Sequence, residues 1–310
     1  MIKKSEIKIL IAGLALLMCG NAGAQEIPAL AGVAGAQFLR LDTGARAAAM
    51  GGSTYCSVYD DAFTVFYNPA GLSGIGKFEL GCQYNMWYEG IESESVVAAV
   101  KLKSGSVIGV AGTYLHMGDI TGTDENKQAT GNFTAFDTAG MVSYARKLGQ
   151  AGKTADGLYA GLNLKLIYQA IEVETATGFA ADLGMLFRAG GFSAGLALQN
   201  AGTKMKFIET AYALPINLRS GISYATTGEN RLSLSAGISL VSFDGLVVSA
   251  GGEYVMKDLF SMRAGYTTGN GLMDGFTAGA GIKTGVIVLD YAWIPGMLGN
   301  AQRVSLNIRF

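Results

Sequence analysis

Charged residues are scarce in this chain of 310 residues, where Asp, Glu, Lys and Arg together make up 15% of the sequence. A soluble domain usually carries about 25% charged residues, so the composition is not that of an ordinary soluble protein. The net charge is −1, which leaves no basic excess to neutralise phosphates and argues against nucleic acid as a partner. Proline is rare too, with 4 residues against 45 glycines.

Groups that carry catalysis or bind metals are also few. His116 is the only histidine, and the spacing around it shows no arrangement of nucleophile and acid. We therefore predict that the chain is not an enzyme, and we expect His116 to be an interface residue at a strand end. Asp119, Asp124 and Glu125 lie in the longest expected loop, but their spacing fits no EF-hand, so we interpret them as solvated charge. The sequence predicts no metal site and no cofactor.

Long apolar runs are missing after residue 24, so no membrane-spanning helix is expected in the mature chain. Before that point, three lysines precede the apolar stretch 9–18, and Ala22-Gly23-Ala24 supplies small residues at a cleavage position. This pattern predicts a cleaved secretory signal peptide over residues 1–24. The stretch 9–18 is itself shorter than the roughly 20 residues that a membrane helix requires.

Only two cysteines, Cys56 and Cys82, belong to the mature chain. Export to an oxidising compartment would permit a disulfide between them, while two unpaired packing residues fit the sequence equally well.

Alternation of apolar and polar residues is the dominant pattern of the chain. Over 303–310 every second residue is apolar, and the same alternation recurs over 231–240 and 162–166. Successive side chains of a strand point to opposite faces, so each of these segments predicts a strand with one apolar and one polar face.

Strand length and number distinguish a membrane barrel from a soluble sandwich. The candidate strands run over about 9 to 15 residues, long enough to cross the hydrocarbon layer when tilted. Aromatic residues such as Tyr114, Tyr168 and Trp293 fall near strand ends, as an interfacial girdle requires. We place the strands at 77–88, 94–102, 105–116, 133–147, 157–171, 178–188, 192–200, 215–225, 230–240, 245–255, 259–267, 275–284, 286–294 and 302–310.

This even number of strands, joined alternately by longer and shorter connections, is typical of bacterial outer-membrane barrels. We therefore predict an all-β fold: a transmembrane antiparallel β-barrel of about 14 strands over residues 76–310, in contact with outer-membrane lipid of a Gram-negative bacterium. Glycines inside the strands, such as Gly161, Gly195 and Gly251, permit either curvature of the wall or the close approach of a plug, and we favour curvature.

Residues 25–75 do not alternate and are expected to form an N-terminal hatch inside the barrel. The segment 45–50 favours a helix, and Gly51-Gly52 is expected to end it. A turn is predicted at Asn68-Pro69-Ala70-Gly71, because these residue types are typical of turns. Apolar residues such as Phe63 indicate that the segment is buried. We expect the acidic pair Asp60-Asp61 to meet arginines of the lumen, for which the candidates are Arg219, Arg231, Arg303 and Arg309.

The hatch also carries a resemblance to a known family. Residues 44–52 (GARAAAMGG) and the elements 60–64 (DDAFT) and 68–72 (NPAGL) resemble the N-terminal signature of the PorV/PorQ family, and 290–292 and 303–306 resemble its last two strands. The Asp-Asp-Ala…Asn-Pro-Ala-Gly element is also similar to the hatch of FadL-type transporters of long-chain fatty acids. The resemblance implies a fourteen-stranded, plugged, FadL-like barrel. The hatch residues that carry it are Arg46, Gly51, Gly52, Asp60, Asp61, Asn68 and Pro69.

Three functions compete at this stage. The resemblance to PorV/PorQ implies a type IX secretion component that binds exported cargo proteins or secretion-system partners, and we place this interpretation first. A FadL-like transporter of hydrophobic small molecules across the outer membrane is the alternative. A barrel enzyme is the weakest of the three, because no paired acid, base or nucleophile is found.

Overall fold

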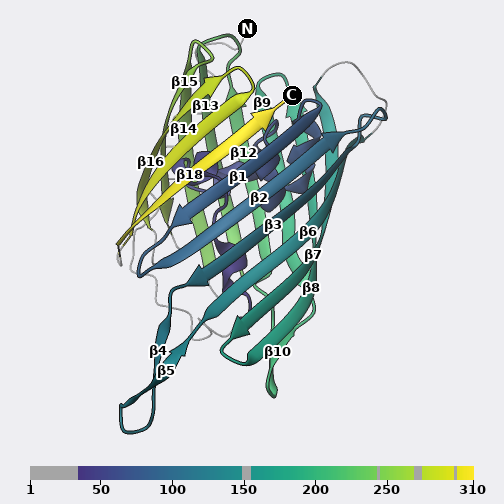
Figure 1. The fold of residues 1–310 in the computed structure, drawn as a ribbon. Coiled ribbons are helices and arrows are strands. Elements are labelled where there is room, and N and C mark those ends of the chain that lie inside the picture. Colours follow the sequence, from purple (N-terminus) through teal and green to yellow (C-terminus); the bar gives the residue numbers. More distant parts are fainter. Residues whose placement is uncertain (1–33, 149–154, 243–244, 269–273, 297–298) are drawn as a thin grey trace.

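The computed structural model describes residues 34–148, 155–242, 245–268, 274–296 and 299–310, and Figure 1 shows its arrangement. The expected signal peptide 1–24 and the first hatch residues 25–33 lie outside the described residues. The main sheet is a closed barrel in which every neighbouring pair is antiparallel. Its fourteen strands are β1 (Phe78–Met86), β2 (Ile91–Lys101), β3 (Val107–Met117), β6 (Ala135–Leu148), β7 (Gly157–Ile171), β8 (Glu174–Ala189), β9 (Phe192–Gly202), β12 (Asn217–Ala225), β13 (Arg231–Val241), β14 (Gly245–Met256), β15 (Phe260–Thr268), β16 (Gly275–Thr284), β17 (Ile287–Gly296) and β18 (Gly299–Arg309).

The predicted barrel of 14 strands is therefore confirmed. The barrel closes where β1 pairs with β18, with Glu79 opposite Arg309, and the backbone N–H of Lys77 donates to the carbonyl of Phe310 at 2.7 Å. The largest difference from the sequence pattern is at β8, which begins at Glu174 where alternation predicts residue 178. Threonine, alanine and glycine occupy 175–178, so the two faces of the strand differ little in polarity there and alternation does not mark its start.

The two faces of the wall differ as alternation requires. In β1, Glu79, Gly81 and Gln83 face the buried lumen, while Leu80 and Tyr84 lie on the outside and are each 37% exposed. Apolar side chains cover the outside of the other strands in the same way, because in lipid this face meets hydrocarbon. The lumen is largely polar, with buried side chains such as Asn163 and Asp182.

The two ends of the barrel differ in their connections. Short turns lie at the end near the C-terminus, for example 190–191 between β8 and β9. From the opposite end project two extra hairpins, β4 (Ile120–Thr123) with β5 (Ala129–Phe133) and β10 (Met205–Phe207) with β11 (Thr210–Tyr212) (Figure 1). Such barrels keep short turns in the periplasm and longer loops outside the cell, so the hairpin end is the extracellular one.

The hatch fills the lumen with short helices, drawn in purple inside the barrel in Figure 1. The α-helix is α2 (Ala45–Ala49), and the 3-10 helices are η1 (Gln37–Arg40), η2 (Ser53–Ser57), η3 (Ala62–Phe66) and η4 (Pro69–Gly74). Helix α2 ends at Ala49 with Met50 as its C-cap, after which Gly51 and Gly52 adopt φ angles of 81° and 67°. Glycine adopts such angles without the steric cost that a Cβ atom brings. In the described part of the chain, no helix has both the length and the apolar character to cross a membrane.

Several strand glycines lie directly against the hatch. A Cβ atom added to Gly195 would lie 2.0 Å from the carbonyl oxygen of Cys56, and one on Gly161 would lie 2.3 Å from the nitrogen of Ala70. A Cβ on Gly251 would lie 2.4 Å from the carbonyl oxygen of Met50. The favoured interpretation of these glycines as points of curvature is therefore wrong, because they let the hatch backbone approach the wall closely.

Cys56 and Cys82 are not bonded to each other. Cys56 is fully buried in the hatch, whereas Cys82 lies on the outward face of β1, and both are free thiols.

Candidate functional site

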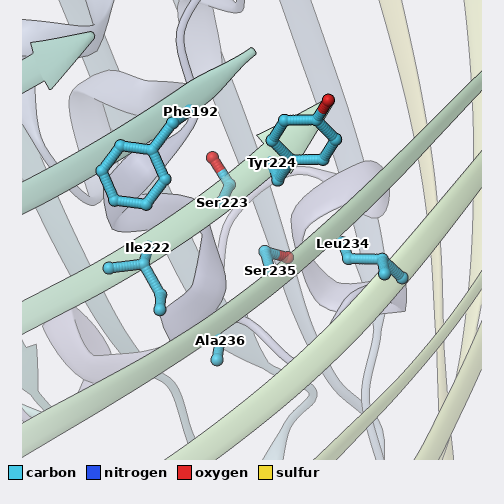
Figure 2. A pocket seen from close by; sticks show the side chains of 7 residues that line it. All are labelled: Phe192, Ile222, Ser223, Tyr224, Leu234, Ser235 and Ala236. Atoms are coloured by element: carbon cyan, nitrogen blue, oxygen red, sulfur yellow. The ribbon is translucent and has the colours of Figure 1, made fainter. Parts of the chain in front are cut away.

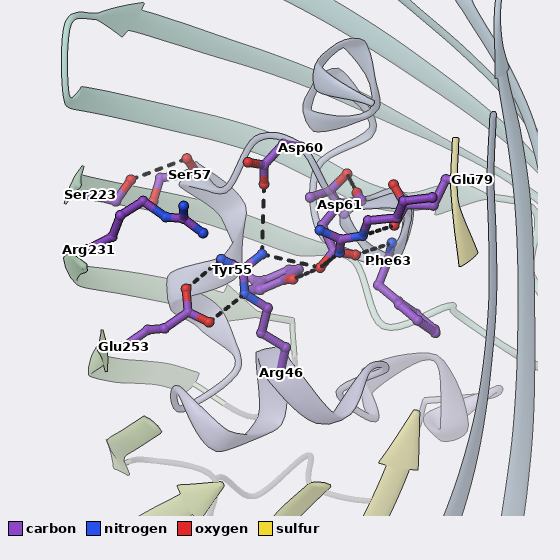
Figure 3. Close-up of polar contacts among 12 residues, drawn as sticks. Arg46, Tyr55, Ser57, Asp60, Asp61, Phe63, Glu79, Ser223, Arg231 and Glu253 are labelled. Carbon is purple, nitrogen blue, oxygen red and sulfur yellow. Dashed lines mark hydrogen bonds and ion pairs between the residues drawn. The ribbon is translucent and has the colours of Figure 1, made fainter. Parts of the chain in front are cut away.

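Arg46 links the hatch to the barrel wall (Figure 3). Its Nε atom donates to Oε1 of Glu253 at 2.9 Å and its Nη2 atom to Oε2 at 2.7 Å, so helix α2 is held to β14 by a two-pronged ion pair. The Nη1 atom of Arg46 also lies 3.4 Å from Oδ2 of Asp61, within the hatch. The two parallel hydrogen bonds fix the orientation of the Arg46 guanidinium relative to the Glu253 carboxylate as well as their distance, which a single hydrogen bond would not do.

Asp61 is the second junction, with a side chain only 1% exposed. Its carboxylate accepts hydrogen bonds from the Tyr55 hydroxyl and, at 2.9 Å, from the backbone N–H of Phe63, where it caps η3. Arg309 of β18 approaches it at 3.2 Å. Burial alone would raise the pKa of Asp61, but Arg309, Arg46 and the Tyr55 hydroxyl hold the pKa below its usual value, so the group is an anion.

These contacts extend into one chain of alternating charges across the lumen. Arg309 lies 3.0 Å from Glu79, and Arg263 lies 2.7 Å from both Glu253 and Asp290. The ion-pair chain consists, in order, of Glu79, Arg309, Asp61, Arg46, Glu253, Arg263 and Asp290. With every group counted as ionised, four carboxylates against three guanidiniums give it a formal net charge of −1. Burying ions costs several kcal/mol each, so such a chain is weak support for stability. We interpret it as a device that fixes the position of the hatch.

Asp60 does not occupy the place that the sequence indicates. Its side chain is 63% exposed and lies 3.8 Å from Arg46, on a backbone with φ of 85°. Of the four candidate arginines, only Arg309 reaches the acidic pair, through Asp61.

The other three candidate arginines have different partners. Arg219 lies 3.9 Å from Asp42, Arg231 lies 2.7 Å from Asp258 in a periplasmic turn, and Arg303 donates to Asn85. Sequence spacing could not select among the four arginines because all of them alternate onto the same lumen face.

Asn68 and Pro69 fasten the other end of the hatch. The Asn68 amide donates to the carbonyls of Cys56 and of Met185 in β8, both at 2.9 Å, while its oxygen accepts from the N–H of Ala70 and caps η4. Pro69 occupies the start of η4, where a missing N–H costs nothing. A Cβ on Gly184 would lie 2.1 Å from Oδ1 of Asn68, so the motif and the strand glycine fit each other.

An apolar cluster, named here the outer cluster, closes the extracellular end of the lumen. It combines hatch residues with residues of several strands and of the β10–β11 region. Its larger members are Phe38, Leu39, Leu41, Trp87, Ile91, Leu115, Ile167, Met205, Phe207 and Leu214. The hatch enters this cluster through Ala36, whose N–H donates to Oε1 of Gln169 at 2.9 Å. Sequence reasoning missed the outer cluster because its members come from distant segments. The one available signal was the apolar content of 38–41.

A separate shallow pocket lies on the membrane side of the wall (Figure 2). Small Ala236 leaves space between larger neighbours, of which Ile222 is 41% exposed. The lining residues are Phe192, Ile222, Ser223, Tyr224, Leu234, Ser235 and Ala236. The pocket lies at the periplasmic ends of β9, β12 and β13, away from the outer cluster.

Comparison with solved structures places this fold among known channels. The toluene transporter TodX of Pseudomonas putida matches 86% of this chain and 96% of its own, with 13% identity and a TM-score of 0.58. The toluene transporter TbuX of Ralstonia pickettii matches 86% and 98%, with 14% identity and a TM-score of 0.59. A FadL homologue of Pseudomonas aeruginosa matches 86% and 97%, with 12% identity and a TM-score of 0.56.

The chain therefore has the fold of FadL-like outer-membrane channels. These neighbours are channels and transporters rather than enzymes. No protein-family model and no curated protein sequence matches the chain.

Proposed function

We propose that this protein is an outer-membrane channel for small hydrophobic molecules, closed in the present conformation by its hatch. The observation that carries the proposal is the outer cluster, which places packed apolar side chains of the hatch and of the wall at the extracellular end of the lumen. A hydrophobic molecule arriving from outside would meet this surface first. The proposal also draws on the fold, which the toluene transporters and the FadL homologue share.

The composition of the outer cluster couples binding to movement of the hatch. Phe38, Leu39 and Leu41 belong to the hatch, while Leu115 and Ile167 belong to the wall. An apolar ligand that packs on the wall residues replaces the contacts of the hatch residues. A ligand shifts such an equilibrium only by its greater affinity for one of the two states. Here the ligand binds the state with the displaced hatch more tightly, because only in that state can it contact the wall residues.

Tryptophan fluorescence gives a direct test, because Trp87 and Trp293 are the only tryptophans. Trp87 packs against the outer cluster, whereas Trp293 lies on the outward face of β17 and is 41% exposed. In a Trp293→Phe background we expect a saturable change in Trp87 emission as a long-chain fatty acid or toluene is added. The same ligands should enter proteoliposomes faster than protein-free liposomes.

A pair of hatch variants makes the test specific. Phe38→Asn weakens the packing of the hatch against the wall residues that the ligand must reach, so it should strengthen ligand binding, whereas Phe66→Asn changes a hatch residue packed against a separate apolar cluster and should leave binding unchanged. An absent fluorescence response together with uptake no faster than in empty liposomes would refute the channel proposal.

The PorV/PorQ-like role is the second candidate. Its specific support is the hatch motif, since Arg46, Asp61 and Asn68 from the segment 44–72 all make buried contacts that keep the lumen filled. A filled lumen suits a protein that presents a surface to secreted cargo or secretion partners.

Affinity purification from mild detergent, with mass spectrometry of proteins and lipids, separates the two candidates. Co-purified secreted proteins sharing a C-terminal domain would support the secretion role. A barrel carrying fatty acid or another apolar ligand would support the channel.

A further inference from the structure

Three side chains with metal-binding groups meet on the membrane-facing side of β2 and β3, near the extracellular end. In the sheet register Glu92 lies opposite His116, and Glu94 lies two residues further along the same face. The Nε2 atom of His116 is 3.3 Å from Oε1 of Glu94 and 3.8 Å from Oε2 of Glu92. One potential ligand atom of each residue lies within 4.8 Å of the other two.

The charges of this cluster are not balanced by the protein. In the described residues, the ion pairs of Glu92 and Glu94 are made with His116 alone, and Oε2 of Glu94 is buried without a hydrogen-bond partner. One imidazole supplies at most a single positive charge against two carboxylates. Like charges this close disfavour each other, and an unpartnered carboxylate oxygen adds a further cost. A divalent cation bound with a neutral imidazole would balance both carboxylates.

The cluster is also held in place. The imidazole ring of His116 stacks on Tyr114 with ring centroids 5.2 Å apart, and Tyr114 packs against Phe136 at 5.6 Å. Because all three potential ligands project from paired strands rather than from loops, their separation is fixed by the sheet. Ligands on regular elements hold a metal geometry more accurately than ligands on loops.

We propose that Glu92, Glu94 and His116 bind a divalent transition-metal ion of the Zn²⁺ type at the outer rim of the barrel. One imidazole nitrogen with two carboxylate oxygens suits Zn²⁺, whereas Ca²⁺ and Mg²⁺ prefer sites made of oxygen alone. Three protein ligands leave a further coordination position for water. The ion ties β2 to β3 at the point where the chain leaves β3 for the β4–β5 hairpin. This site departs from the sequence-based prediction of no metal, because residues far apart in the chain become neighbours only through the register.

The test uses the mature chain without a polyhistidine tag, treated with chelator and titrated with zinc chloride by calorimetry. We expect one site per barrel. His116→Ala and Glu94→Gln should each weaken binding by about tenfold or more, a loss that even groups one step removed from a metal can cause. Glu89→Gln is the matched control, since Glu89 is an exposed acid in the adjoining turn and should leave the affinity unchanged.

A second measurement is independent of affinity. His116 is the only histidine, so a chain labelled with ¹⁵N-histidine gives one pair of ring nitrogen signals. Zinc should shift the signal of the coordinating Nε2 atom in the wild type and in Glu89→Gln. The proposal is overturned if zinc leaves these signals unmoved, or if His116→Ala binds zinc as tightly as the wild type. It is equally overturned if magnesium chloride displaces the zinc at comparable concentration, which would indicate an acidic pair alone.

Discussion

Replacing Arg46 by methionine should release the hatch while leaving the barrel closed. Methionine keeps an apolar stem of similar reach but removes the two hydrogen bonds to Glu253 and the contact with Asp61. The ion-pair chain then holds four carboxylates against two guanidiniums, so its formal net charge moves from −1 to −2. Both lost contacts involve the hatch, and the pairing of β14 with its neighbours is untouched.

The free-energy cost of this substitution follows from the burial of the Arg46 and Glu253 side chains. Removing one partner of a buried ion pair costs about 3–5 kcal/mol. The Arg46 side chain is 19% exposed and that of Glu253 is 3% exposed, so some water already reaches the pair and the lower end of that range applies. A cost of about 3 kcal/mol corresponds to roughly a hundredfold rise in the population of the open hatch.

The reactivity of the Cys56 thiol measures the population of molecules with an open hatch. It is fully buried, and burial raises the pKa of the Cys56 thiol to about 12, so the closed hatch presents no reactive thiolate. In a chain that begins at residue 25 and carries Cys82→Ala, Cys56 is the only thiol. Its rate of labelling by a maleimide in detergent then follows the opening of the hatch, and Arg46→Met should raise the rate by about two orders of magnitude.

The matched control is Arg231→Met. Arg231 pairs with Asp258 at 2.7 Å, but both side chains are more than one-third exposed, and pairs of this kind contribute about 0–1 kcal/mol. We expect no change in Cys56 labelling in this variant. Equal labelling rates in Arg46→Met and the parent would refute the reasoning, as would an equal acceleration in Arg231→Met.

Three further predictions use the same hatch. Gly195→Ala should speed Cys56 labelling by about fivefold or more, because the new Cβ would meet the Cys56 carbonyl and overpacking costs about 1–3 kcal/mol; Gly140→Ala, with nothing within 4 Å, should not. Asn68→Ala should also speed Cys56 labelling, at a cost of about 1–3 kcal/mol, since it removes the amide that donates to the carbonyls of Cys56 and Met185, and unchanged labelling would contradict that role. Because the folded pKa of Asp61 is lowered, its contribution is present above about pH 4 and is lost as the pH falls further. Pepsin should therefore cleave the hatch faster between pH 4 and pH 2, with a smaller pH dependence in Asp61→Asn.

The barrel itself could be derived from the sequence because alternation is a local property. A residue such as Val304 or Leu306 faces lipid whatever its partner strand, so the apolar and polar faces are already visible in the order of residues. The N-terminal hatch could be expected for a similar reason, since a non-alternating apolar segment before a polar-lined barrel has few places to be buried. Local chemistry also located the end of α2 just before Gly51-Gly52.

The contacts that define the candidate sites depend on three-dimensional placement. Arg219, Arg231, Arg303 and Arg309 alternate onto the same face, and only the path of the hatch through the lumen decides that Arg309 meets Asp61. The strand glycines are equally ambiguous, because a missing side chain serves a bend or a close approach, and the position of the hatch backbone decides between them.

The sequence by itself therefore determined the class of fold, the strand pattern and the existence of a hatch, because each rests on periodicity or short-range backbone chemistry. Tertiary structure alone decided the ion-pair chain, the outer cluster and the meeting of Glu92, Glu94 and His116. These features join residues that are distant in the chain, and their distances are set by strand register and barrel closure. No single segment encodes those two quantities.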